Sequence, residues 1–171
     1  MNKNSKQYNR SVSYKKKIAF SVNDVWKIIS TPSNLELFHP FCLKNTVEKW
    51  PGENSMDSIE YYNGMILNRT FVNWIKNEGY DLFIGRKNGS LSFVSWRIKK
   101  VSDNSCTIKI SVYPYKYNMG SKFLNFIPFF FFIYPIIKKY LKQVIFGLDW
   151  HLQNRIKIPK NQFGNNFYFS K

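Results

Sequence analysis

The sequence predicts an α+β fold: a seven-stranded antiparallel sheet with two short helices after the first strand and a long C-terminal helix. Three patterns indicate this. A helix signal follows the first strand-like segment, six strand-like segments then follow one another through short turns, and apolar residues recur at helical spacing near the C-terminus. With 171 residues, 19% of them aromatic, the chain is long enough for one domain with a sizeable core.

The first strand is expected from Val12 to Phe20, where apolar and polar residues alternate. Lys16 is an exception, because it falls on the apolar face of this strand. Residues 1–10 are polar and basic, and they are expected to form a flexible N-terminus that precedes the folded domain.

Two short helices are expected next. Ser21, with Asp24 three residues later, approximates a capping box and would start the first of them. Thr31 and Pro32 fit the N-cap and the first helical position of the second, which must end near Pro40.

A meander of six strands is expected after these helices. Asn63-Gly64 and Asn88-Gly89 are good tight-turn candidates within it. Because the connections are short, consecutive strands should pair antiparallel. The expected strands are 43–50, 57–62, 65–75, 79–86, 91–101 and 106–117.

An uncharged apolar run, 123–137, lies between Lys122 and Lys138. As a straight helix it would reach only about 22 Å, less than the roughly 30 Å of a hydrocarbon core. Pro128 and Pro135 are also expected to break it into short pieces, so a transmembrane span is not expected. Three roles stay open: a lid over an apolar cavity, a segment that dips into a membrane surface, and core.

The long C-terminal helix is expected from about Ile136 to Arg155, with one apolar face, and Pro159 stops it. This reading divides the chain into a folded domain at 11–158 and a C-terminal tail at 159–171.

The formal charge of +16 is concentrated at the two ends of the chain and raises an anionic membrane as a partner. Nucleic acid is disfavoured, because phosphate recognition favours Arg and most of the basic residues here are Lys.

Cys42 and Cys106 lack metal-ligand spacing and are expected to be free thiols. The N-terminus has no apolar segment typical of a secretory signal. We therefore expect a cytoplasmic protein, peripheral to a membrane if the apolar run contacts one.

The order of these elements resembles the START/Bet v 1-like (SRPBCC) superfamily, in particular its polyketide cyclase/dehydrase-like branch. The resemblance covers roughly residues 12–157 and rests on IAFSVNDVW at 18–26, LFHP at 37–40 and SWRI at 95–98. It implies a helix-grip fold whose curved sheet and long helix enclose a hydrophobic ligand cavity. Members of the superfamily include lipid carriers, hormone and allergen-type binders, quinone-binding proteins and aromatase or cyclase enzymes, so the resemblance does not choose a function.

His39 is the candidate catalytic residue, because the resemblance places it at the edge of the cavity. It would act as a general acid or base with a pKa near neutrality; the alternative is an imidazole bonded to backbone at a helix end. His151 is out of step with the apolar face of its helix and is expected at the surface. Two distant histidines without a metal-binding motif argue against metal catalysis, and no cofactor is expected.

Arg69 is the strongest candidate for a ligand contact, since its period-2 neighbours are apolar. If that face is inward, the guanidinium needs an anionic partner such as a lipid headgroup, a ligand carboxylate or Glu60; if the other face is inward, Arg69 is solvated. Arg97 is expected to point outward. The other expected ligand-binding residues, for which ordinary core is the alternative, are Tyr61, Trp74, Trp96, Tyr113, Leu141, Ile145 and Leu148.

Together these patterns predict a protein that binds an apolar or amphipathic small molecule, lipid or isoprenoid-like. An enzyme of the cyclase or dehydratase type, using His39 or a cavity carboxylate, is the alternative. A protein-interaction module that acts through its basic ends is a third class. As a gate on an anionic membrane, the apolar run would use Phe129, Phe130, Phe131 and Phe132, with Lys138 and Lys139 among the headgroups.

Overall fold

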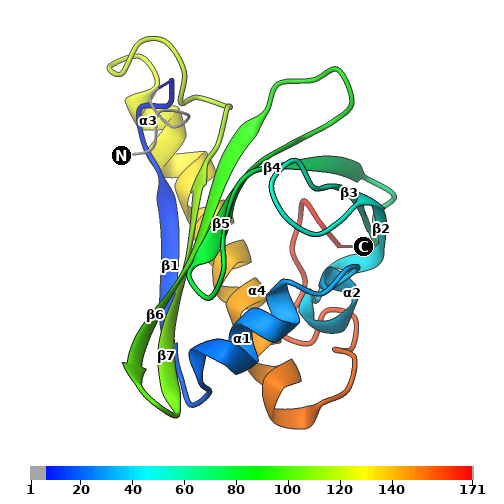
Figure 1. The fold of residues 1–171 in the computed structure, drawn as a ribbon. Helices are drawn as coiled ribbons and strands as arrows, with labels where there is room; N and C mark the ends of the chain where they lie inside the picture. Colours follow the sequence, from blue (N-terminus) through cyan, green and yellow to red (C-terminus); the bar gives the residue numbers. More distant parts are fainter. Residues whose placement is uncertain (1–6, 171) are drawn as a thin grey trace.

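The computed structural model describes residues 7–170 and confirms the predicted α+β architecture (Figure 1). One seven-stranded sheet has the order β1-β7-β6-β5-β4-β3-β2, and every neighbouring pair is antiparallel. Its strands are β1 (Val12–Ile18), β2 (Cys42–Lys49), β3 (Met56–Tyr61), β4 (Ile66–Ile75), β5 (Gly79–Gly85), β6 (Ser92–Ser102) and β7 (Ser105–Tyr113). The helical elements are α1 (Val22–Ile29), α2 (Leu35–Phe38), α3 (Phe126–Pro128), η2 (Phe129–Ile133) and α4 (Tyr134–Asn154).

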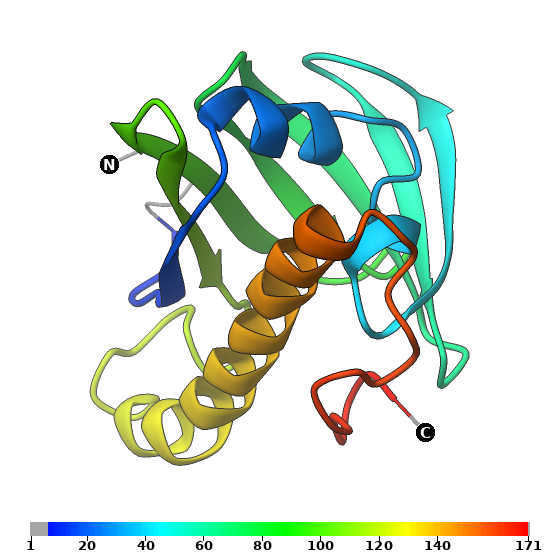
Figure 2. The same ribbon diagram turned by 90° about the horizontal axis from the view of Figure 1, so that it is seen from below.

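The sheet curves around α4, which crosses its concave face. The short helices α1 and α2 lie beside the C-terminal end of α4 (Figures 1 and 2). This arrangement explains Lys16, whose side chain is directed at α4. Its ammonium forms an ion pair with Asp149 and lies 4.6 Å from the centroid of the Phe146 ring. A lysine on an apolar strand face is tolerated here because the facing helix supplies the opposite charge.

The capping box at α1 is confirmed. The Ser21 hydroxyl accepts the Asp24 N–H at 3.1 Å, and the Asp24 carboxylate accepts the Ser21 N–H at 3.2 Å. The expected start of the second helix is wrong: α2 begins at Leu35, and Thr31 instead closes the preceding helix by donating its hydroxyl to the Lys27 carbonyl. The backbone of Ser33 explains the delay, because its φ of +56° cannot continue a right-handed helix.

The run is divided at Pro128, where α3 ends, as predicted, whereas Pro135 lies inside α4 and does not break the helix. The elements α3, η2 and α4 follow one another without a gap, and η2 is a π-helical segment in which the Tyr134 N–H donates to the Phe129 carbonyl. Pro135 lies in the first turn of α4, where its fixed φ suits a helical backbone. No helix within residues 7–170 combines the length and apolar character needed to cross a membrane.

Gly147 lies where α4 passes α2. A Cβ at this position would come within 2.1 Å of the Phe38 carbonyl oxygen and 3.1 Å of Pro40 Cδ. Gly147→Ala is therefore expected to lower the free energy of unfolding by about 1–3 kcal/mol, although alanine favours a helix over glycine. Urea denaturation measures the change, with the exposed Lys142→Ala on the same helix as a control expected to change little. Equal stability of Gly147→Ala and wild type would contradict this close helix crossing.

Candidate functional site

A cavity of about 460 Å³ lies between the concave face of the sheet and α4. Apolar side chains from β3 to β7 and from α4 form most of its wall, among them Ile59, Leu82, Val94, Ile110, Ile137 and Val144. The exposed members of the wall, which mark its mouth, are Arg86, Gly89, Ser90, Tyr115, Lys116 and Tyr168. The size and lining are those of a pocket for a small organic molecule.

Several residues singled out in the sequence line this cavity. They are His39, Tyr61, Arg69, Trp96 and Leu141. The sequence left open which face of β4 points inward. The structure shows that it is the face that carries Arg69.

Four other residues of the expected site lie elsewhere among the described residues. Trp74 belongs to an aromatic cluster in which its ring centroid is 5.5 Å from that of Trp26 and 5.0 Å from that of Trp50. Tyr113 follows the cavity-lining Val112 on β7 and so points to the opposite face of the sheet, where it packs on Phe93 and Tyr8. Ile145 and Leu148 are fully buried in the core beneath α4.

His39 is buried at the C-terminal end of α2, and its imidazole points into the molecule rather than to solvent. Its Nδ1 accepts the Phe41 N–H at 3.3 Å, so the neutral ring carries its proton on Nε2, which donates to the Tyr140 hydroxyl at 2.8 Å. Burial, with the positive charge of Arg69 as a second cause, lowers the pKa of His39 from 6.5 to about 3. The expectation of a pKa near neutrality is therefore wrong.

The second histidine also differs from its prediction. His151 is buried rather than exposed, and its Nδ1 lies 2.7 Å from the Ile156 carbonyl oxygen just after the end of α4. The chain turns at Arg155, whose φ is +58°, and thereby brings that carbonyl back onto the helix. Within residues 7–170 the two histidines belong to no cluster of potential metal ligands.

Two tyrosine hydroxyls extend the polar group at His39. The Tyr140 hydroxyl lies 3.2 Å from the Tyr61 hydroxyl, and both side chains line the cavity. Burial raises the pKa of Tyr140 to about 12 and that of Tyr61 well above its ordinary value. His39, Tyr140 and Tyr61, the polar trio, are therefore all neutral near pH 7.

Arg69 has an anionic partner inside the protein, and it is not Glu60. The Asp57 carboxylate accepts bonds from Nε at 2.7 Å and from Nη2 at 2.5 Å, and both side chains are buried. The two residues face each other directly in the β3–β4 register. Burial disfavours the charge of Arg69, but Asp57 outweighs this effect and raises its pKa above the ordinary value. The pair brings no net charge to the cavity wall.

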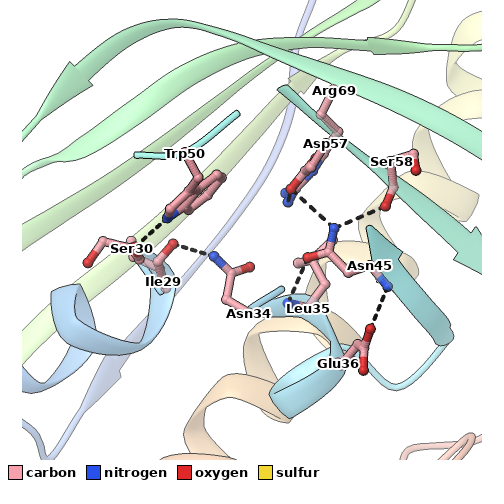
Figure 3. Close-up of polar contacts among 10 residues, drawn as sticks. All are labelled: Ile29, Ser30, Asn34, Leu35, Glu36, Asn45, Trp50, Asp57, Ser58 and Arg69. Carbon is pink, nitrogen blue, oxygen red and sulfur yellow. Dashed lines mark hydrogen bonds and ion pairs between the residues drawn. The ribbon is translucent and has the colours of Figure 1, made fainter. Parts of the chain in front are cut away.

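Asn45 connects this ion pair to α2 (Figure 3). Its amide donates to Asp57 at 3.1 Å and to the Ser58 carbonyl at 3.0 Å, while its oxygen accepts the Leu35 N–H at 3.3 Å. The Asn45 N–H in turn donates to Glu36 at 2.8 Å. Both contacts to α2 fix the short helix that ends at His39, so the ion pair helps to orient the polar trio.

The C-terminal tail closes one side of the cavity with Tyr168 and Phe169, which no periodic pattern in the sequence indicated. Phe169 lies with its ring centroid 4.4 Å from that of Tyr140 and 4.8 Å from that of Tyr61. The tail is held by hydrogen bonds from Gln143 to the carbonyls of Phe163 and Gly164 and from Asn63 to that of Tyr168. Its aromatic residues were the available signal, but they had no helical or strand periodicity.

The residues proposed for a gate differ in exposure. Phe129 is fully buried, whereas Phe130, Phe131 and Phe132 are exposed by 41%, 72% and 60%. Lys139 is exposed, and Lys138 donates its ammonium to the Ser13 carbonyl at 2.6 Å. The apolar run is therefore only partly buried: the Phe129 side chain lies in the core, and the other three phenylalanines are exposed.

Comparisons with known proteins identify the fold. No protein-family model matches the chain, and no curated protein matches it in sequence. DynU16, from the dynemicin biosynthetic locus, matches in structure with a TM-score of 0.65 at 10% identity over 86% of this chain and 48% of that chain, so this chain spans about half of DynU16.

Two further structures match along most of both chains. Norcoclaurine synthase from Thalictrum flavum, in complex with dopamine and hydroxybenzaldehyde, has a TM-score of 0.60 at 12% identity over 87% of this chain and 89% of its own. A START superfamily protein from Mycobacterium smegmatis has a TM-score of 0.58 at 12% identity over 85% and 96%. The chain therefore has the SRPBCC/Bet v 1-like fold; at these identities the likeness concerns the fold alone.

Proposed function

We propose that this protein of SRPBCC/Bet v 1-like fold binds an apolar or amphipathic small molecule, lipid or isoprenoid-like, in its internal cavity. The observation that carries the proposal is the cavity of about 460 Å³ between the sheet and α4, with its largely apolar wall. Ligand pockets span about 300–1,000 Å³ and combine apolar walls with a few polar groups, as this one does.

The polar trio favours a ligand with a neutral, oxygen-bearing end. Within residues 7–170, the His39 N–H and the two tyrosine hydroxyls are three donors that meet in two hydrogen bonds. One hydroxyl proton is thus available to an acceptor such as a ketone, ether or alcohol oxygen. A carboxylate end is disfavoured, because Asp57 already neutralises Arg69.

The enzyme alternative is weakened in the form that uses His39 as a base. A pKa of about 3 makes the imidazole a poor proton acceptor near pH 7. Among the described residues that line the cavity, none is an aspartate or a glutamate. The trio is better suited to hold a ligand than to transfer its protons.

Dye binding and displacement test the proposal. An environment-sensitive apolar dye should bind saturably at one site and be displaced by farnesol more readily than by the carboxylic acid of the same chain. The double variant Tyr61→Phe, Tyr140→Phe removes both hydroxyl donors and should weaken farnesol binding about 2- to 10-fold, the worth of one net hydrogen bond, while leaving dye affinity nearly unchanged. Fluorescence titration measures both affinities.

Two variants control this experiment. Tyr62→Phe removes a hydroxyl outside the cavity wall and should leave farnesol affinity unchanged, whereas Ile137→Trp fills the cavity and should abolish dye binding. Circular dichroism confirms that each variant is folded. Unsaturable dye binding, or dye binding that survives Ile137→Trp, would contradict a cavity ligand.

Exchange of the ligand at a membrane surface belongs to the same proposal. Ile133 and Ile136 line the cavity and directly follow the exposed end of the apolar run. If the exposed end of the run lies on a membrane, a ligand that leaves the cavity between these residues and the mouth would enter the membrane without crossing water.

A further inference from the structure

The elements α3 and η2 lie at one end of the molecule (Figures 1 and 2). They and the residues just before them carry a group of large apolar side chains that are exposed. We call it the apolar tip: Phe123, Leu124, Phe126, Ile127, Phe131 and Phe132. Phe123 is 92% exposed, Leu124 81% and Phe131 72%. Single exposed apolar residues are normal on proteins, but a group of them gathered within residues 123–132 marks a surface that contacts another apolar phase.

The tip is held in place rather than loosely tethered. The Arg10 guanidinium lies 5.5 Å from the centroid of the Phe126 ring and 5.6 Å from that of Phe129, and it donates to the Lys122 carbonyl at 2.7 Å. Phe129 itself is fully buried. The apolar side chains are therefore presented on a braced scaffold, so docking would cost little ordering entropy.

The charge around the tip has one sign. From Asn104 to Leu148 the sequence contains lysines but no aspartate or glutamate, and the same is true of residues 1–23, which include Arg10. Lys122 is exposed and directly precedes Phe123 of the tip, and the exposed residues Lys116 and Arg86 line the cavity mouth. This surface is complementary to an apolar phase with a negatively charged boundary.

A second copy of the chain is a poor occupant of this surface. A two-fold dimer would place the same patch on both sides of the interface, and the lysines of one copy would then face those of the other. Anionic lipid headgroups neutralise these lysines, and the acyl region accepts the phenylalanines.

We propose that the apolar tip docks this protein on membranes that carry anionic lipids. The phenylalanines enter the acyl boundary, and Lys116 and Lys122 contact the headgroups. The tip leads into Ile133 of the cavity wall, and Lys116 belongs to the cavity mouth, so docking through both brings the mouth to the membrane. A role of docking in ligand exchange rests on the proposed ligand binding, whereas the docking itself rests on the exposed apolar and basic residues.

Vesicle co-sedimentation of the full chain tests the docking. Binding to phosphatidylcholine vesicles that contain about a third phosphatidylserine should exceed binding to pure phosphatidylcholine by roughly fivefold for each lysine engaged. It should fall as NaCl rises from about 0.1 M to about 1 M, which shortens the Debye length from about 10 Å to about 3 Å. The double variant Phe123→Ser, Phe131→Ser should bind about tenfold less or weaker still.

Matched controls separate docking from general attraction of a basic protein to anionic vesicles. Phe167→Ser removes a phenylalanine that is 91% exposed, but on the C-terminal tail across α4 from the tip (Figure 2), and should bind as wild type does. Lys122→Glu should weaken binding, whereas Lys99→Glu, at the opposite end of the sheet, should weaken it far less.

Three outcomes would overturn the docking proposal. They are indifference to lipid charge, equal binding of the Phe123→Ser, Phe131→Ser variant and wild type, and self-association through the tip without vesicle binding. The dye titration is independent: vesicle binding without saturable dye binding would remove the cavity function and leave the docking intact.

Discussion

Asp57→Asn is expected to lower the free energy of unfolding by about 3–5 kcal/mol, because it leaves the buried Arg69 charge without its counterion. The Arg69 side chain is only 4% exposed, so little bulk water is available to solvate an unpaired guanidinium. The raised pKa of Arg69 depends on Asp57, yet an arginine stays charged at any accessible pH. Urea denaturation at pH 7 measures the loss.

Two comparisons make this prediction specific. Asp103→Asn removes a carboxylate from the exposed pair with Lys100 and should change stability little, because solvent screens an exposed pair. Replacing both partners, as Asp57→Leu with Arg69→Met, should cost much less than Asp57→Asn alone, because no unpaired buried charge remains. A loss in Asp57→Asn no larger than in Asp103→Asn would contradict a tightly buried pair.

The ion pair also matters for the site. Asn45 connects the ion pair to α2 by hydrogen bonds, and His39 directly follows the last residue of α2. Asp57→Asn should therefore weaken farnesol binding as well as stability, while the fully apolar dye is affected less.

The protein is expected to lose stability in acid through His39. The pKa of this imidazole is about 3 in the folded protein against an ordinary value of 6.5, so the unfolded chain binds the proton more readily. The stability contributed by the neutral imidazole is complete above pH 6.5 and is lost as pH falls through that range towards 3. At about 1.36 kcal/mol per pKa unit, the loss would reach roughly 4–5 kcal/mol.

Urea denaturation at a series of pH values measures this effect. His39→Gln keeps a donor for Tyr140 but cannot titrate, so its stability should fall less steeply between about pH 6 and pH 4. Parallel slopes in wild type and His39→Gln would show that His39 does not carry the acid dependence.

Local patterns predicted the elements well where their physical cause is local. The capping box needs only Ser21 and Asp24, and an antiparallel meander needs only alternating strands and short connections. The exceptions arose where backbone conformation overrides a pattern, as at Ser33 and in the π-helical segment η2. Residue-type signals for turns and helix ends cannot report such conformations.

The candidate site was harder to predict because it depends on pairing register and on facing elements. After β3 the chain reverses so that the Tyr61 N–H donates to the Met65 carbonyl, and the register set by this turn places Asp57 opposite Arg69. A register shift of one residue would place Ser58 or Met56 opposite Arg69 instead and turn the aspartate to the other face. The sequence therefore indicated that Arg69 needed an anion, but not which one.

The sequence by itself determined the order of elements, the long apolar-faced helix, the concentration of positive charge and an apolar run too short to span a membrane. Tertiary structure alone decided that Arg69 is neutralised by Asp57, that His39 joins Tyr140 and Tyr61, and that Phe169 closes the cavity. The physical reason is distance along the chain. Periodicity and capping act within a few residues, whereas burial, register and charge pairing arise only when distant segments meet.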